Sequence, residues 1–167
     1  MEDFLRPEKK RGINKIFIVG MLIAVAAIGA AIALLSMRPS SDEQTAGILA
    51  GSIKEGSPGF DDLSKDIIIS TADGTVQSPT GMGTISMFIN GKIRNKGTRT
   101  INALEINVGV VTQKNEVLRE KKIVVVPIQQ ASLDAGETIP ITLTLDGFDR
   151  KDDRANIRWR VTAIKAE

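Results

Sequence analysis

The sequence predicts an all-β domain preceded by one N-terminal transmembrane α-helix. Two observations indicate this fold class. Residues 16–37 form one long run without a charged side chain. Beyond residue 65, apolar and polar residues alternate with a period of two in several short segments, and no helical period recurs there.

The apolar run is long enough to remain in a membrane. About 22 residues form a helix of roughly 33 Å, and a hydrocarbon core is about 30 Å thick. The triplet Ala31-Ile32-Ala33 has the small-x-small pattern of a signal-peptide cleavage site, but Leu34 and Leu35 continue the apolar run beyond it. A permanent anchor is therefore preferred, with a cleaved and freely secreted protein as the alternative.

The charges that flank the run predict its orientation. Five basic residues precede it (Arg6, Lys9, Lys10, Arg11 and Lys15), and Arg38 follows it. Because positive charge is retained in the cytoplasm, residues 1–15 are expected to form a cytoplasmic basic tail and the rest of the chain to be exported, into the periplasm or the extracellular space.

The same flank explains the basic isoelectric point near 9.0. Six of the 22 Lys and Arg and three of the 20 Asp and Glu lie at or before Arg38, which leaves 16 basic and 17 acidic residues beyond it. The basic excess thus belongs to the membrane flank and does not predict nucleic-acid binding.

Small residues recur on one side of the predicted span, at Gly20, Ala24, Ala27 and Ala31. Residues three and four apart share a helix face, and small side chains allow a second membrane helix to approach closely. A docking face for a partner helix is one interpretation. The other is an ordinary lipid-facing anchor, since Ala and Gly are common in single-pass helices.

Residues 38–64 are predicted to be a flexible linker, because Ser, Gly, Asp, Glu and two prolines interrupt any period. A disordered segment of that length spans roughly 25–30 Å. Its short apolar patch, Ile48-Leu49-Ala50, is a candidate for contact with a partner or with the membrane surface.

Residues 65–167 are predicted to form the exported domain. Strands are expected at residues 66–71, 84–94, 100–112, 117–128, 139–145 and around 157–161, with turns at residues 95–98, 113–116 and 133–137. Pro127 lacks an N–H donor and marks a strand exit or edge. An antiparallel β-sandwich of immunoglobulin-like size follows, and without cysteine its core must be held by packing alone.

Two motifs occur in the strand-rich part of the chain: G-x-I-x-N-x-G at a strand end, and L-x-x-G-E in a turn before another strand (Gly91, Ile93, Asn95, Gly97; Leu133, Gly136, Glu137). On these motifs, the chain resembles the FxLYD-type domains of bacterial and archaeal envelope proteins over about residues 84–160. The Tyr-Asp pair that names the family would fall near Val111-Thr112, and this chain has no tyrosine. The resemblance implies an immunoglobulin-like module on the export side.

The residue types exclude several kinds of chemistry. Without histidine and cysteine there is no Ser-His-Asp or Cys-His catalysis and no usual zinc, copper or haem ligand, and Ser-x-x-Lys does not occur. We therefore expect no catalytic residues and no cofactor. The candidates for Ca²⁺ are Asp146, Asp149, Asp152 and Asp153, although neighbouring Arg and Lys neutralise that loop and favour a solvated turn.

These observations predict a membrane-anchored, non-enzymatic interaction protein. The most direct hypothesis is an accessory subunit of an envelope or membrane protein complex, whose β-sandwich docks on a protein partner. The alternative is a ligand-binding or sensing module, for Ca²⁺ or an envelope glycan, displayed on a stalk.

Overall fold

The structure, a computed structural model, describes residues 15–36 and 41–167. It divides into two units, which meet in the sequence at Ser40/Ser41. The predicted basic tail, apart from Lys15, and residues 37–40 lie outside the described residues.

The first unit contains helix α1, Lys15–Ser36. By length and composition it is able to cross a membrane, a property that signal sequences share. The predicted packing residues Gly20, Ala24, Ala27 and Ala31 are all exposed on it. Its large apolar side chains are also exposed, for example Ile28 at 60% and Leu34 at 68%. Transfer of such a surface from water into an apolar environment is favourable.

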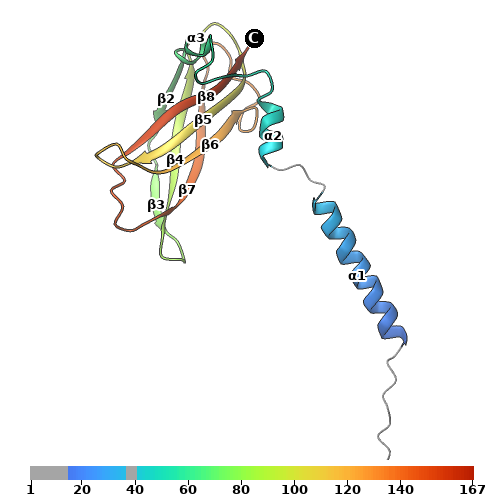
Figure 1. Cartoon of the computed structure of the whole chain (residues 1–167). Coiled ribbons are helices and arrows are strands. Elements are labelled where there is room, and N and C mark those ends of the chain that lie inside the picture. Colours follow the sequence, from blue (N-terminus) through green and yellow to red (C-terminus); the bar gives the residue numbers. More distant parts are fainter. Residues whose placement is uncertain (1–14, 37–40) are drawn as a thin grey trace, which may run out of the picture. The chain divides into compact units, whose positions relative to one another are not determined.

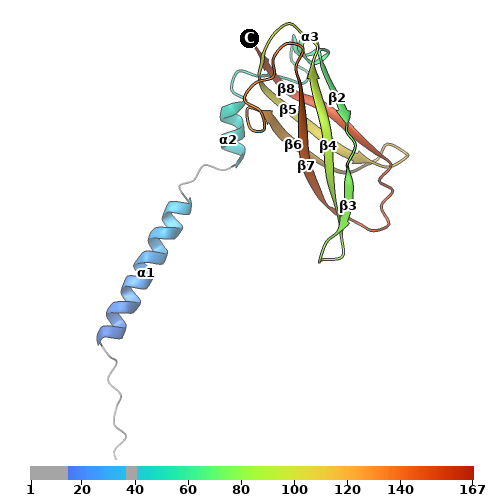
Figure 2. The same ribbon diagram turned by 180° about the vertical axis from the view of Figure 1, so that it is seen from behind.

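The second unit contains two antiparallel sheets (Figures 1 and 2). The first, called the β5 sheet, has the order β1-β8-β5-β6, with bounds Ile53–Lys54, Asn156–Ala166, Ile101–Val111 and Val117–Val126. In the second, the β4 sheet, β4 (Ile85–Asn95) pairs on one side with β7 (Thr138–Phe148) and on the other with β2 (Ile67–Thr71) and β3 (Val76–Pro79) in succession. Two short helices accompany them, α2 (Ser41–Ile48) and α3 (Phe60–Ser64).

One hydrophobic core joins the inner faces of the two sheets. Alternate residues of β4 and β7 meet alternate residues of β5 and β8, as the period of two requires. Its fully buried members include Ile89, Ile93, Leu104, Ile106, Ile141, Phe148 and Ile164. This arrangement confirms the predicted β-rich domain and its inward residues.

Most predicted strands are present within a residue or two of their expected bounds, and β6 ends at Val126, directly before Pro127. Two details differ. Strand β3 was not predicted, because all four of its residues are exposed and leave no alternating pattern. Strand β5 is buried on both faces over much of its length, whereas the sequence predicted burial of one.

The predicted flexible linker over residues 38–64 is corrected from Ser41 onward. Helix α2 leads to Leu49, which is 8% exposed and packs with Ala103, Val124 and Ala163 on the outer face of the β5 sheet. Strand β1 then pairs with β8, and α3 buries Phe60 and Leu63 in the main core. Contacts made by Leu49, β1 and α3 therefore order a segment whose composition is typical of a linker.

The motif residues that carry the sequence resemblance have structural roles. Gly91 lies under Trp159, and a Cβ there would come within 2.8 Å of the indole Cη2 atom. Trp159 Nε1 donates to Thr71 Oγ1 at 2.9 Å, which fixes the half-buried ring at the junction of the sheets. Gly136 has a φ of +77°, a backbone conformation that glycine adopts without strain.

Candidate interaction surface

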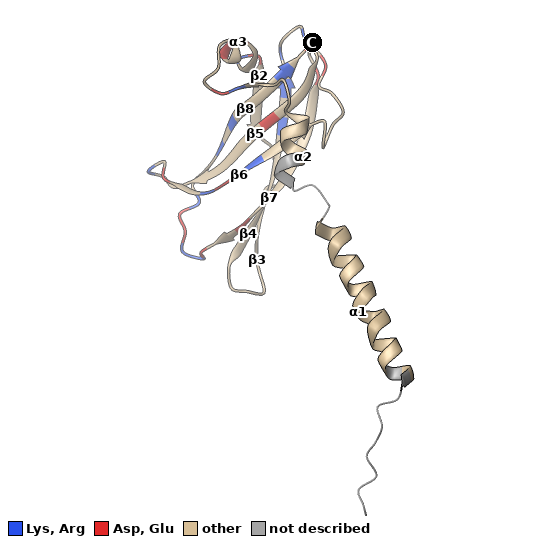
Figure 3. Cartoon of the chain, turned by 45° about the vertical axis from the view of Figure 1, so that its right-hand side comes forward, with Lys and Arg blue, Asp and Glu red and all other residues tan. Residues whose placement is uncertain are grey.

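The outer face of the β5 sheet gathers charged side chains from four strands. The Cα register places Asn107 of β5 between Lys122 of β6 and Arg160 of β8. In Figure 3, basic segments on β6 and β8 flank the acidic segment on β5. We call this surface the charged face; its members are Lys54, Glu55, Glu105, Asn107, Glu120, Lys122, Arg158, Arg160, Thr162 and Lys165.

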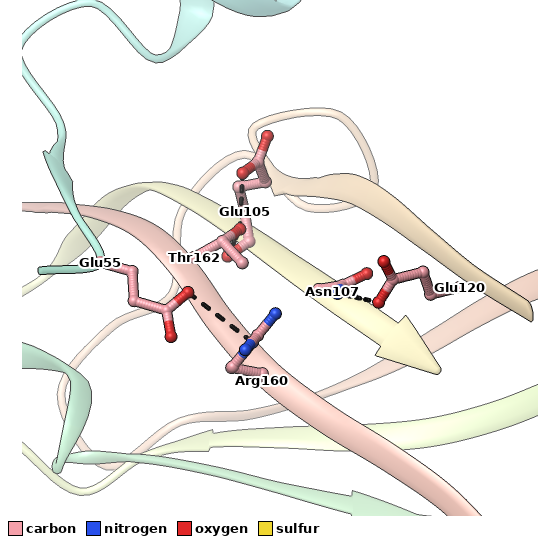
Figure 4. Close-up of polar contacts among 6 residues, drawn as sticks. All are labelled: Glu55, Glu105, Asn107, Glu120, Arg160 and Thr162. Atoms are coloured by element: carbon pink, nitrogen blue, oxygen red, sulfur yellow. Dashed lines mark hydrogen bonds and ion pairs between the residues drawn. The ribbon is translucent and has the colours of Figure 1, made fainter. Parts of the chain in front are cut away.

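Three polar contacts cross this surface (Figure 4). Asn107 Nδ2 donates to Glu120 Oε2 at 2.9 Å, and Thr162 Oγ1 donates to Glu105 Oε1 at 2.5 Å. Arg160 Nε lies 3.7 Å from Glu55 Oε2. Because the Arg160 and Glu55 side chains are 54% and 47% exposed, their ion pair contributes little to stability.

The centre of the charged face is more deeply buried than its rim. Asn107 and Thr162 are each 6% exposed, although both lie on the outer side of the sheet. Asn107 Oδ1 is buried and accepts no hydrogen bond. A buried acceptor without a donor is uncommon in folded proteins.

A pocket of about 430 Å³ lies at the edge of this face, beside α2. Its walls come from α2, from the turn that follows it, from Lys54 in β1 and from Glu105 in β5. Leu49 and Ala46 supply apolar surface, and Thr45 supplies a hydroxyl. The corrected fold of residues 41–64 is thus what creates the pocket.

The four predicted Ca²⁺ candidates do not converge on one point. Asp152 Oδ2 accepts the N–H of Asp149 at 2.7 Å, and Asp153 Oδ2 accepts the N–H of Gln113 at 3.0 Å. Asp146 lies within β7 and is exposed. Over residues 15–36 and 41–167, no three His, Cys, Asp or Glu side chains are arranged to hold a metal ion. Asp152 and Asp153 instead accept backbone N–H groups of two different turns.

Sequence reasoning did not assemble the residues of the charged face into one surface, although a signal for their outward position was present. In β5, Glu105 and Asn107 alternate with Leu104, Ile106 and Val108, which predicts that they face outward. The pattern could not predict which side chains lie beside them. Thr162, Glu120 and Arg160 are brought beside them only by the pairing of β5 with β6 and β8.

No protein-family model matches the chain, and no curated protein matches its sequence. Among solved structures, the crystal structure of a protein designated ApaA from Bordetella pertussis is similar at 20% sequence identity and a TM-score of 0.36. The similarity covers 48% of this chain and 67% of that one. A likeness of this degree carries no functional argument.

Proposed function

We propose that this chain is a membrane-anchored, non-enzymatic interaction protein, whose β domain docks on a protein partner in an envelope or membrane complex. Helix α1 supports the anchor, since it is long, uncharged between Ile16 and Ser36, and exposed throughout its described side chains. The basic residues before it support an orientation with the N-terminus in the cytoplasm and the domain exported.

We also infer that the domain is immunoglobulin-like. In that fold, the second strand pairs with the fifth in one sheet and the third pairs with the sixth in the other. The pairs β4–β7 and β5–β8 correspond to these two pairings, and β6 lies where an additional strand joins the second sheet. Strand β1 then occupies the position beside β8 that the seventh strand takes in that fold.

The observation that carries the docking proposal is the charged face. The side chains of Lys122, Arg158 and Lys165 form neither an ion pair nor a hydrogen bond to another described residue. Beside them, the Asn107 acceptor is buried and unpartnered. A partner that supplies carboxylates would pair with the exposed cations, and such complementarity gives specificity and rate of association.

Site-specific photo-cross-linking in native membranes tests this proposal. A photoreactive amino acid is placed at Lys122 or Arg158 on the charged face, and at Lys92 on the outer face of the β4 sheet as a control. All three side chains are exposed. We expect a discrete cross-linked product from the first two positions and none from Lys92. Equal labelling at all three, or none at any, would contradict a docking role for this face.

Protease protection tests the orientation separately. The chain should be digested down to a membrane-protected fragment when protease reaches the export side of intact membranes. Digestion only after the cytoplasmic side is opened would show the opposite orientation.

The ligand-binding alternative is favoured by one observation, the pocket beside α2.

A further inference from the structure

The pocket beside α2 contains one charge of each sign that the fold leaves unpaired. Lys54 and Glu105 both line it, yet no ion pair within 4.0 Å joins them. The Lys54 ammonium has neither an ion pair nor a hydrogen bond among residues 15–36 and 41–167. Glu105 Oε1 accepts from Thr162, while no described residue donates a hydrogen bond to Glu105 Oε2. The pocket therefore offers a cation and a carboxylate oxygen, held apart.

This charge pattern selects against simple ions. An anion attracted to Lys54 meets the carboxylate of Glu105, and a cation attracted to Glu105 meets the ammonium of Lys54. A zwitterion can satisfy both groups at once, since its anion and its cation can each form a charge-assisted hydrogen bond. The apolar atoms of Leu49 and Ala46 suit the short hydrocarbon spacer that joins the two groups in such a molecule.

The position of the pocket in the chain indicates the source of the zwitterion. Only residues 37–40 separate the end of α1 from the start of α2, and a chain of that length covers at most about 18 Å when fully extended. The pocket begins at Thr45, in the middle of α2. If α1 spans a bilayer, as proposed above, α2 is held within that reach of the lipid headgroups.

We propose that this pocket binds the headgroup of a phospholipid that carries a primary amine, such as phosphatidylethanolamine. The headgroup ammonium donates to Glu105 Oε2, and its phosphate accepts from Lys54 Nζ. Thr45 lines the same pocket, and its hydroxyl is a second candidate donor to the phosphate. The inference that the zwitterion belongs to a lipid rests on the proposed membrane anchor, whereas recognition of a zwitterion depends only on the β domain.

Native mass spectrometry of the full chain, delipidated in maltoside micelles, tests the lipid. Phosphatidylethanolamine is compared with phosphatidylcholine, whose nitrogen has no N–H donor, and with phosphatidylglycerol, which has no amine, all with the same acyl chains. We expect at least tenfold tighter binding of the first. Lys54→Met and Glu105→Gln should each weaken it at least tenfold. Equal binding of all three lipids would overturn the proposal.

Matched controls separate the pocket from general charge effects. Lys92→Met and Glu116→Gln make the same changes at exposed positions outside the charged face and should leave lipid binding unchanged. If all four variants lose binding alike, the pocket is not the site. The fluorescence of Trp159, the single tryptophan, confirms in each variant that the domain is folded.

Titration with soluble zwitterions distinguishes a lipid headgroup from a free zwitterion as the ligand. Glycerophosphoethanolamine and glycine are titrated separately into the full chain in micelles, and binding is followed by NMR. We expect millimolar binding of the first that is lost in Glu105→Gln, and weaker binding of glycine. Tighter binding of glycine would overturn the lipid assignment. Because this titration requires neither a spanning helix nor a protein partner, its failure is distinguishable from failure of the proposed function.

Discussion

Replacement of Asn95 by alanine should destabilise the β domain more than any exposed asparagine does. Asn95 is 1% exposed. Its Nδ2 donates to the carbonyls of Arg99 at 2.8 Å and Leu133 at 3.2 Å, and its Oδ1 accepts the N–H of Gly97 at 2.9 Å. One side chain thus fixes the loop after β4 and ties it to the turn before β7.

The magnitude follows from these three hydrogen bonds. Each contributes a net of about 1 kcal/mol, which gives about 3 kcal/mol in total. The loss is somewhat smaller, about 2–3 kcal/mol, for two reasons. In the variant, the carbonyl of Leu133 still accepts a hydrogen bond from the N–H of Ile101. Arg99 is exposed, so water can reach its carbonyl. For a domain of this size the midpoint of thermal unfolding should fall by about 10 °C.

Urea unfolding of the full chain in detergent measures this effect, with Trp159 fluorescence as the signal. Since α1 contains no tryptophan, the signal reports only the β domain. At a slope of about 2 kcal/mol per molar urea, the Asn95→Ala midpoint should fall by about 1 M. Asn156→Ala, at an exposed position in β8, is the control. If the two variants unfold within about 0.2 M of each other, the loop is not held as described.

Three further changes test other parts of the fold by the same unfolding measurement. Gly91→Ala should cost about 1–3 kcal/mol and shift Trp159 emission to longer wavelength, because the new methyl group displaces the indole; an unshifted spectrum would contradict their contact. Leu49→Ala should cost about 2 kcal/mol and expose α2 to protease, whereas a free linker would show neither effect. Gln129→Ala removes two hydrogen bonds to Thr142 and should cost about 0.5–1 kcal/mol, with increased self-association in sedimentation; unchanged sedimentation would count against edge protection.

The strands of the β domain were predictable because burial of one face imposes a period of two on the sequence. Ile89, Ile93, Ile141 and Leu143 show this pattern and all lie in the core. The pattern fails where one-sided burial ends. Strand β3 has no buried residue, and in β8 the alternation shifts at Thr162, because an extra residue enters the pairing with β5 there.

The fold of residues 41–64 was not predictable from local sequence. Helix α2 has only eight residues and a mostly polar composition, and so short a helix is not stable alone. It persists because Leu49 reaches Ala103, Val124 and Ala163, which lie more than fifty residues further along the chain. A tertiary contact of this kind leaves no periodic signal near the helix.

The free edge of β7 is closed by side chains rather than by another strand. Gln129 Nε2 donates to the carbonyl of Thr142 at 3.2 Å, and its Oε1 accepts the N–H of the same residue at 3.3 Å. Further along, Arg119 Nη2 donates to the carbonyl of Gly147 at 2.9 Å. These contacts occupy the backbone groups that an added strand would need.

The edge strands β3 and β6 are protected against pairing with an added strand in different ways, which limits how a partner can bind. Thr80 N donates to Thr84 O, so the nitrogen of the preceding Pro79 points to the free side of β3, where it offers no donor. Strand β6 presents the charged run of residues 119–122 at its edge, and repeated charges oppose pairing with a second sheet. A partner that adds a strand would find few open backbone groups on β3, β6 or β7. Recognition is therefore expected to occur through side chains on a sheet face, and the charged face of the β5 sheet is where unpaired charges and a buried acceptor coincide.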